Sequence, residues 1–307
     1  FDNIFLHGYT SSTNNVATSG SHQPTIMGGY DAFINKISKD GQKLWGTYYG
    51  GNYSDASGGL DFDNNDNIFV VADISIPNPM YPGNTYYYFA QLAILKFKPD
   101  GTLVFEKIFG GKSKDISYDL RYYNNNIYII GETYSDDLAT PGAFQNSITV
   151  GMQAGFVGKF KASDGSTEWI SYITGNSHTT VGKIFSANSN GIEIIATTRA
   201  TDFPMVNAFQ PTSHIAPGST NNNGLYLNFS ESGALLRSSY VGENHSYYFE
   251  SARRFGDEIF FGAHVYTKSQ ASFFVANLLT NTVVEKNIPV VQKYVYKYID
   301  DFRLKSG

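Results

Sequence analysis

The sequence predicts an all-β protein, a β-propeller of four-stranded antiparallel blades with five blades visible in the chain. Two patterns and the composition support this fold class. A strand-like segment recurs five times at intervals of about sixty residues, a period typical of propeller blades or similar arrays. A second segment, with a short turn at its centre, follows each copy. Aromatic residues make up 16% of the chain beside 30 glycines, a balance that favours strands joined by many turns.

The first recurring segment begins with a small polar or charged residue, continues with β-branched and aromatic residues, and ends near Gly or Ala. Its five copies are residues 3–10, 67–74, 126–133, 191–198 and 258–264. Runs of this kind bounded by Gly and Asn predict strands. We assign each copy to the second strand of a blade.

The second recurring segment supplies two more strands and the turn between them. In the first unit, residues 31–38 and 43–49 flank Asp40-Gly41, and the other units carry Asp100-Gly101, Asp164-Gly165, Ser232-Gly233 and Thr280-Asn281 at the same place. Gly accepts the positive φ that a tight hairpin demands. The third and fourth strands of every blade are therefore expected here.

The remaining strand of each blade precedes the first recurring segment. We place it around residues 60–62, 119–122, 183–185, 252–255 and 301–304. A lone sheet of this composition has two apolar faces, and only neighbouring blades in a ring can cover both. We expect one domain over 1–307, closed by a strand near 298–304 that completes the blade starting at 1–10. The alternative is a five-unit part of a propeller with six to eight blades.

Loops between the second and third strands look alike in three units: residues 9–25, 133–145 and 201–212. Together with Asp31–Ile37, the Asp-Gly turns and Tyr48-Tyr49-Gly50-Gly51, these loops resemble the bacterial propeller repeats called SBBP. The resemblance covers nearly the whole chain and is weakest after Ser269. It implies a secreted or surface propeller of the Bacteroidetes type, in a family that is nominally seven-bladed and whose motif residues are mainly structural.

Charge and composition exclude several classes of function. The net charge is -5 with scattered basic residues, which argues against a nucleic-acid surface. The absence of cysteine excludes thiol catalysis and disulfides. The six histidines show no ligand spacing, and His7 and His264, on matching second strands, are expected to pack or face solvent. We expect no metal and no cofactor.

Carboxylate groups in the sequence suggest turns rather than a catalytic pair. Residues 61–67 place Asp and Asn at alternate positions like a calcium loop but lack its Gly and distal Glu, so we favour a turn. Asp136 and Asp137, as neighbours on a strand, would face opposite ways. We assign no catalytic residue, although acid and base groups on different blades stay open.

The stretch 74–89 is the most unusual, with Pro77, Pro79 and Pro82 before a run of four aromatic residues. Tyrosine at a surface offers apolar area with a hydroxyl, which suits protein or glycan contact. The candidate partner- or ligand-binding residues are Tyr81, Tyr86, Tyr87, Tyr88 and Phe89. The alternative is that these rings cover a blade edge.

The leading hypothesis from sequence is a non-catalytic interaction module outside the cytoplasm: periplasmic, secreted or associated with the outer membrane. Its partner would be a protein of the bacterial envelope, such as an outer-membrane channel or secretion component, with a possible role in adhesion. A lectin-like glycan binder is the second hypothesis. The third is a hydrolase or lyase with a site in the central funnel.

Overall fold

A computed structural model describes residues 3–77, 88–149, 151–216, 218–243, 245–265 and 270–287. The regular structure in these ranges consists of nineteen strands, which form five antiparallel sheets. No helix in the described residues is long and apolar enough to cross a membrane.

We number the sheets 1 to 5 in chain order, and each pairs its strands consecutively. Sheet 1 holds β1 (Ile4–Thr10), β2 (Asp31–Ile37) and β3 (Lys43–Tyr49). Sheet 2 holds β4 (Ala56–Phe62), β5 (Ile68–Pro77), β6 (Tyr88–Phe97) and β7 (Leu103–Phe109). Sheet 3 holds β8 (Asp115–Tyr123), β9 (Asn126–Thr133), β10 (Ala154–Lys161) and β11 (Thr167–Ile173). Sheet 4 holds β12 (Thr179–Asn188), β13 (Gly191–Thr198), β14 (Asn223–Phe229) and β15 (Leu235–Val241). Sheet 5 holds β16 (Tyr247–Phe255), β17 (Glu258–Val265), β18 (Gln270–Asn277) and β19 (Thr282–Asn287).

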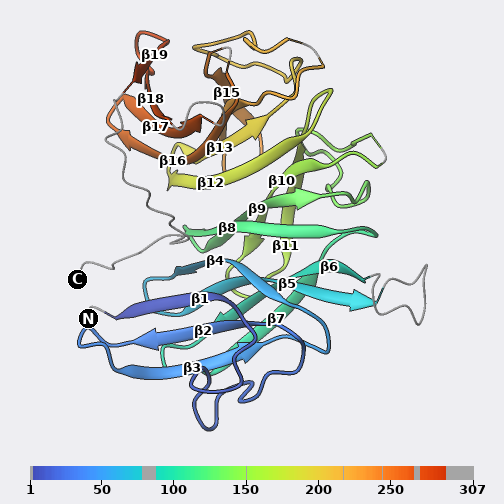
Figure 1. The fold of residues 1–307 in the computed structure, drawn as a ribbon, viewed down its shortest axis with the longest axis vertical. Helices are drawn as coiled ribbons and strands as arrows, with labels where there is room; N and C mark the ends of the chain where they lie inside the picture. The colour runs from blue at the N-terminus through green and yellow to red at the C-terminus, as the bar shows by residue number, and fades with distance from the viewer. Residues whose placement is uncertain are drawn as a thin grey trace.

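The sheets follow one another as blades of a propeller, from the blue sheet 1 to the red sheet 5 in Figure 1. The first strands of consecutive sheets contact each other: β4 with β8, β8 with β12, and β12 with β16. These are the inner strands of the blades, and β1 adjoins them through β4. The prediction of an all-β propeller with four-stranded blades is confirmed for sheets 2 to 5. The closing strand predicted near 298–304 lies outside the described residues.

The apolar core lies between the sheets, as the argument for stacked blades requires. Four buried clusters each combine side chains of two consecutive sheets. One of them joins Phe69 and Leu92 of sheet 2 to Leu120 and Phe156 of sheet 3. The middle strands are therefore covered on both faces, and β5 is fully buried from Ile68 to Ala72. This explains why their sequences are nearly continuous apolar runs.

The predicted hairpin turns have the expected backbone. Gly41, Gly101, Gly165 and Gly233 have φ between 70° and 88°, and Asn281 takes the same place at 54°. At two of these turns, the indole of a tryptophan in the preceding sheet donates a hydrogen bond to a backbone carbonyl of the hairpin. Trp45 donates from Nε1 to the carbonyl of Pro99 at 3.0 Å, and Trp169 does so to Glu231 at 3.0 Å. Both tryptophans therefore serve packing at the outer edge of the blade, as their equivalent positions suggest.

Every complete sheet carries a β-bulge in its inner strand at the same level, and β12 has a second register shift between Ile184 and Ser186. The shared register shifts lie between Ser57 and Gly59, between Ser117 and Asp119, between Val181 and Lys183, and between Phe249 and Ser251. A bulge adds one residue and bends its strand. The inner strands are consequently irregular where they surround the axis, and this region forms the cavity described next.

Candidate functional site in the axial cavity

The inner strands enclose a cavity of about 470 Å³ on the propeller axis. Its wall comes from β1, β4, β8, β12 and β16, so four complete sheets and sheet 1 contribute to it. The polar groups facing it include His7, Ser57, Tyr118, Asp119 and Lys183. A cavity with several converging polar side chains is the preferred place for a small-molecule site.

His7 and Ser57 form a close pair in this wall. Nδ1 of His7 lies 2.9 Å from Oγ of Ser57, and both side chains are half-buried. The hydroxyl of Ser57 also donates to the carbonyl oxygen of Gly8 at 3.2 Å, so its single proton can point either to Gly8 or to Nδ1 of His7. A hydroxyl within hydrogen-bond reach of an imidazole is the arrangement that activates a serine nucleophile. The tautomer that accepts from Ser57 carries its proton on Nε2.

In sheet 1 the described strand that lines the cavity is β1, the second strand of the predicted blade. In sheets 2 to 5 the second strand is covered on its axial side by the first strand of its own sheet. In the described part of sheet 1, β1 is the edge strand. Among the described residues, Phe5, His7 and Tyr9 of β1 line the cavity, and no residue of β5, β9, β13 or β17 does.

The serine equivalent to Ser57 in the next sheet has a different partner. Ser117, at the same place before its bulge, donates from both its backbone N and its Oγ to Oδ1 of Asp73. Burial raises the pKa of Asp73 to about 7, although the two Ser117 hydrogen bonds act to lower it. Ser117 is itself buried. This pair holds sheet 2 to sheet 3, whereas Ser57 faces an imidazole at the cavity.

Asp119 is a buried carboxylate on the cavity wall. Burial raises its pKa to about 6, against the opposing charges of Arg121 and Lys183. Its Oδ2 accepts the backbone N–H of Ile184 at 3.0 Å, and Arg121 donates from Nε to the carbonyl of Ile184 at 2.9 Å. Asp119 and Arg121 thus bind the backbone N–H and the carbonyl of Ile184 on β12. Their main role is therefore to join sheets 3 and 4.

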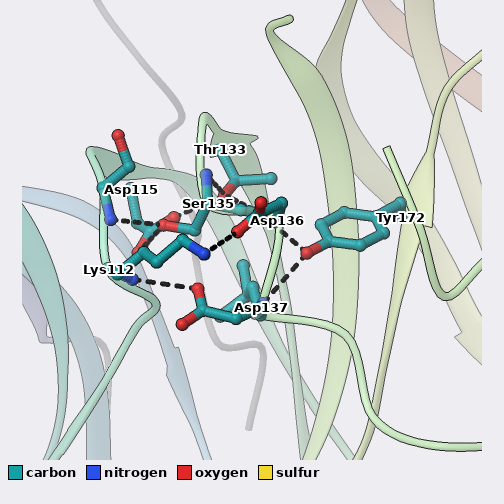
Figure 2. A network of polar contacts seen from close by, with 9 residues as sticks. Lys112, Asp115, Thr133, Ser135, Asp136, Asp137 and Tyr172 are labelled. Atoms are coloured by element: carbon teal, nitrogen blue, oxygen red, sulfur yellow. Dashed lines mark hydrogen bonds and ion pairs between the residues drawn. The ribbon is translucent and has the colours of Figure 1, made fainter. Parts of the chain in front are cut away.

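A polar network at the junction of sheets 2 and 3 also gathers carboxylates, as Figure 2 shows. Asp115 accepts from Thr133, from Ser135 and from the backbone of Gly111, and burial raises its pKa. Asp55 accepts from the backbone of Gly51 at the preceding junction. The recurrence indicates a structural role.

Asp136 and Asp137 belong to the same network and correct the prediction made for them. They lie in the turn after β9, and both meet one residue: Asp136 pairs with Nζ of Lys112 at 2.7 Å, and Asp137 accepts its backbone N–H at 2.9 Å. Successive residues of a strand would face opposite ways, but a turn has no such alternation. Asp136 thus forms an ion pair with the side chain of Lys112, while Asp137 binds the backbone of the same residue.

The residues singled out from sequence have mixed outcomes. Tyr88 and Phe89 begin β6 and pair with Pro77 and Ile76, while Tyr81, Tyr86 and Tyr87 lie outside the described residues. Their role as a binding surface stays a prediction. In the 61–67 stretch, Oδ1 of Asp63 accepts the N–H groups of Asn65 and Asn67, so the turn interpretation is confirmed.

Sequence reasoning missed the Ser57–His7 pair and assigned His7 to packing or solvent. The two residues lie in different sheets with no local motif between them, so only the fold brings them together. In the described ranges, no three His, Cys, Asp or Glu side chains lie close enough to hold a metal ion.

Comparison with known proteins finds no match among family models and none among curated proteins. Solved structures with a similar fold include an apocarotenoid oxygenase of Synechocystis, at 9% identity and a TM-score of 0.40, covering 86% of this chain and 58% of that one. A chimera of this oxygenase with RPE65 matches at 10% identity with the same TM-score and coverage. The lignostilbene dioxygenase of Pseudomonas brassicacearum matches at 12% identity and a TM-score of 0.36, covering 94% of this chain and 80% of that one.

The chain therefore spans less than two thirds of the length of the first two neighbours. By their names these neighbours are enzymes, and this finding overturns the expectations that the chain is no enzyme and acts as a non-catalytic interaction module. TM-scores of 0.40 or less carry neither the reaction nor the substrate of the neighbours to this chain.

Proposed function

We propose that this protein is a hydrolase of small carboxylic esters and that its reaction takes place in the axial cavity. The observation that carries the proposal is the 2.9 Å contact between Ser57 Oγ and His7 Nδ1 in the cavity wall. This deepens the third hypothesis from sequence, a hydrolase in the central funnel.

The chemistry assigns one role to each residue of the pair. Ser57 Oγ attacks the ester carbonyl carbon while His7 Nδ1 takes the hydroxyl proton, and His7 then gives that proton to the departing alkoxide, which leaves as the alcohol. Water attacks the acyl-serine in the same way, and its proton returns to Ser57 through His7. The products are a carboxylic acid and an alcohol.

The bulge beside Ser57 supplies the candidate donor for the oxyanion. Gly58 is the extra residue of β4 between the paired residues Ser57 and Gly59, so it stands outside the regular ladder. A Cβ at Gly58 would lie only 2.4 Å from the carbonyl oxygen of Ser117, which leaves glycine as the residue that fits. Its backbone N–H is next to the nucleophile and is the group we assign to the developing negative charge.

Hydrolysis of p-nitrophenyl acetate and butyrate tests the proposal. We expect S57A and H7A each to lower kcat/KM by about 100-fold or more, because one removes the nucleophile and the other removes the general base. The matched control is S117A, which removes the equivalent serine that binds Asp73, and it keeps the activity. Unchanged turnover in folded S57A contradicts the proposal.

A covalent probe gives a second measurement that does not depend on turnover. A fluorophosphonate labels activated serines, and peptide mass spectrometry locates the label. We expect it on Ser57 in the parent protein and no label on Ser57 in H7A. A label on other serines with none on Ser57 in the parent excludes Ser57 as the nucleophile.

An extracytoplasmic location is part of the proposal. The composition rich in Tyr and Asn and the resemblance to SBBP repeats support it. Cell fractionation of the native organism tests it, and recovery in the cytoplasmic fraction contradicts it.

A further inference from the structure

A second cavity adjoins the axial cavity. It has a volume of about 250 Å³, and Thr180 of β12 lines both cavities. Its other walls come from the ends of β12 and β13, the segments before β10 and β14, and β16. Thr180 therefore stands at the boundary between the two spaces.

Arg199 is the principal charged group of the second cavity. Its Nε donates to Oδ1 of Asn222 at 3.0 Å, and its backbone N donates to the carbonyl of His178 at 3.0 Å. Asn222 is buried, 5% exposed, and donates from Nδ2 to Oγ of Ser246 at 3.3 Å. The guanidinium is thus oriented by a residue that is itself held in place.

The charges around Arg199 are not balanced within the cavity. Among the described residues that line it there is no Asp or Glu, and the others are Gln153, His178, Thr180, Thr197, Asn222 and Tyr248. Within the described ranges, Nε is the only side-chain atom of Arg199 with a hydrogen-bond partner. The two Nη groups remain as donors, and a guanidinium binds carboxylate or phosphate oxygens through two parallel hydrogen bonds.

We infer that the second cavity is an anion subsite, and that the esters hydrolysed at Ser57 carry a carboxylate or phosphate group bound by Arg199. This inference rests on the proposed function, because it extends the same site. The shared chemistry is a compact anion with two oxygens in one plane that face the guanidinium. Hydroxyl and amide groups around it, such as Thr197 and Gln153, supply neutral hydrogen bonds.

Binding without turnover tests the subsite. Titration calorimetry of S57A with succinate and with inorganic phosphate measures affinity in a protein that lacks the nucleophile. We expect one of these anions to bind and R199M to weaken its binding by about 10- to 100-fold, the scale of a charge-assisted hydrogen bond. R199K, which keeps the charge, retains part of the affinity. K98M is the control, because exposed Lys98 lies at the β6–β7 hairpin and lines neither cavity.

Each outcome bears on a separate claim. Preference for succinate identifies a carboxylate ligand, and preference for phosphate identifies a phosphate ligand. Equal affinity in R199M and the parent, or no binding of either anion, overturns the subsite. If S57A keeps esterase activity while R199M loses anion binding, the proposed function fails and the subsite stands.

Kinetics then link the subsite to the reaction. With p-nitrophenyl hemisuccinate, we expect R199M to raise KM at least about tenfold relative to the parent protein. With neutral p-nitrophenyl butyrate, R199M leaves kcat/KM within about twofold. Equal effects on both esters contradict a role in substrate recognition and indicate a structural one.

Discussion

The indole Nε1 of Trp169 donates a hydrogen bond of 3.0 Å to the carbonyl oxygen of Glu231, which belongs to the hairpin of the next sheet. The ring also limits what the hairpin can carry. A Cβ at Gly233 would lie 2.9 Å from the indole, and φ at this residue is +85°. Trp45 makes the same contact with Gly101.

The first prediction concerns these glycines. G233A combines the cost of a left-handed backbone, about 1–2 kcal/mol, with overpacking against the indole, about 1–3 kcal/mol. G41A is the matched control, since Gly41 has φ +81° with no atom within 4 Å of an added Cβ. Urea denaturation is expected to show a larger loss for G233A than for G41A. Equal losses would mean that the indole moves aside without cost.

The second prediction is a pH dependence from Asp73. Its folded pKa of about 7 exceeds the ordinary aspartate pKa of 3.8, because the carboxyl group is buried. Between about pH 4 and 7 the folded state therefore keeps a proton that the unfolded state releases, and the free energy of unfolding falls as pH rises. The full effect is roughly 4 kcal/mol at 1.36 kcal/mol per pH unit. D73N removes this loss of stability, because asparagine does not titrate. The variant is therefore expected to be more stable than the parent at pH 8 and to differ little from it at pH 4.

Thermal denaturation from pH 4 to pH 8 measures this difference. D100N is the control, because Asp100 is exposed in a hairpin and its pKa is lowered by the hydrogen bonds from Thr102. D100N should follow the parent above pH 5. A D73N curve parallel to the parent over the whole range would refute the assignment to Asp73.

The third prediction concerns the two hydrogen bonds that Asp119 and Arg121 make with the backbone of Ile184. Removing either partner in D119A or R121A leaves a backbone group of Ile184 without its hydrogen bond, at a cost of about 1–3 kcal/mol. Because both act on one residue, a double-mutant cycle should give a coupling of about 0.5–2 kcal/mol. D119A with R237A, whose arginine binds Asn281, should be additive. Additive losses for D119A with R121A would show that the two contacts are independent.

The fourth prediction compares two buried tyrosines. The hydroxyl of Tyr172 donates to the carbonyl of Ser135 at 2.6 Å and accepts the N–H of Leu138 at 2.9 Å, as Figure 2 shows in part. In the described structure, the hydroxyl of Tyr128 is buried without a hydrogen-bond partner. Y172F should therefore cost about 1–3 kcal/mol, while Y128F is neutral or stabilising. Calorimetric melting of both variants measures these changes in stability. A larger loss of stability in Y128F than in Y172F would contradict the prediction.

Much of the fold follows from local sequence, because hairpins and buried middle strands have strong local patterns. Asp40-Gly41 and Asp164-Gly165 mark turns that exist, and the apolar run from Ile68 marks β5. The predicted positions of the inner strands are right, but the predicted strands are shorter than the observed ones. β4 begins at Ala56, well before the predicted residues 60–62, because Ser57-Gly58-Gly59 contains a bulge and no apolar alternation.

The candidate site could not be derived in the same way. His7 and Ser57 are fifty residues apart and belong to different sheets, and what joins them is the contact between β1 and β4. Arg199 depends likewise on Asn222 and on the neighbouring sheet for its orientation. The aromatic residues from Tyr86 to Phe89 stood out instead because unusual composition is visible locally, whereas a site shared between sheets has no local pattern.

The indole contacts give the chain two separate optical reporters. Trp45 and Trp169 are the only tryptophans in the sequence, and each is placed at a different boundary, between sheets 1 and 2 or between sheets 3 and 4. Fluorescence of a protein with one indole replaced by phenylalanine therefore follows the opening of a single boundary. Two such proteins can show whether the array comes apart from one end or all at once.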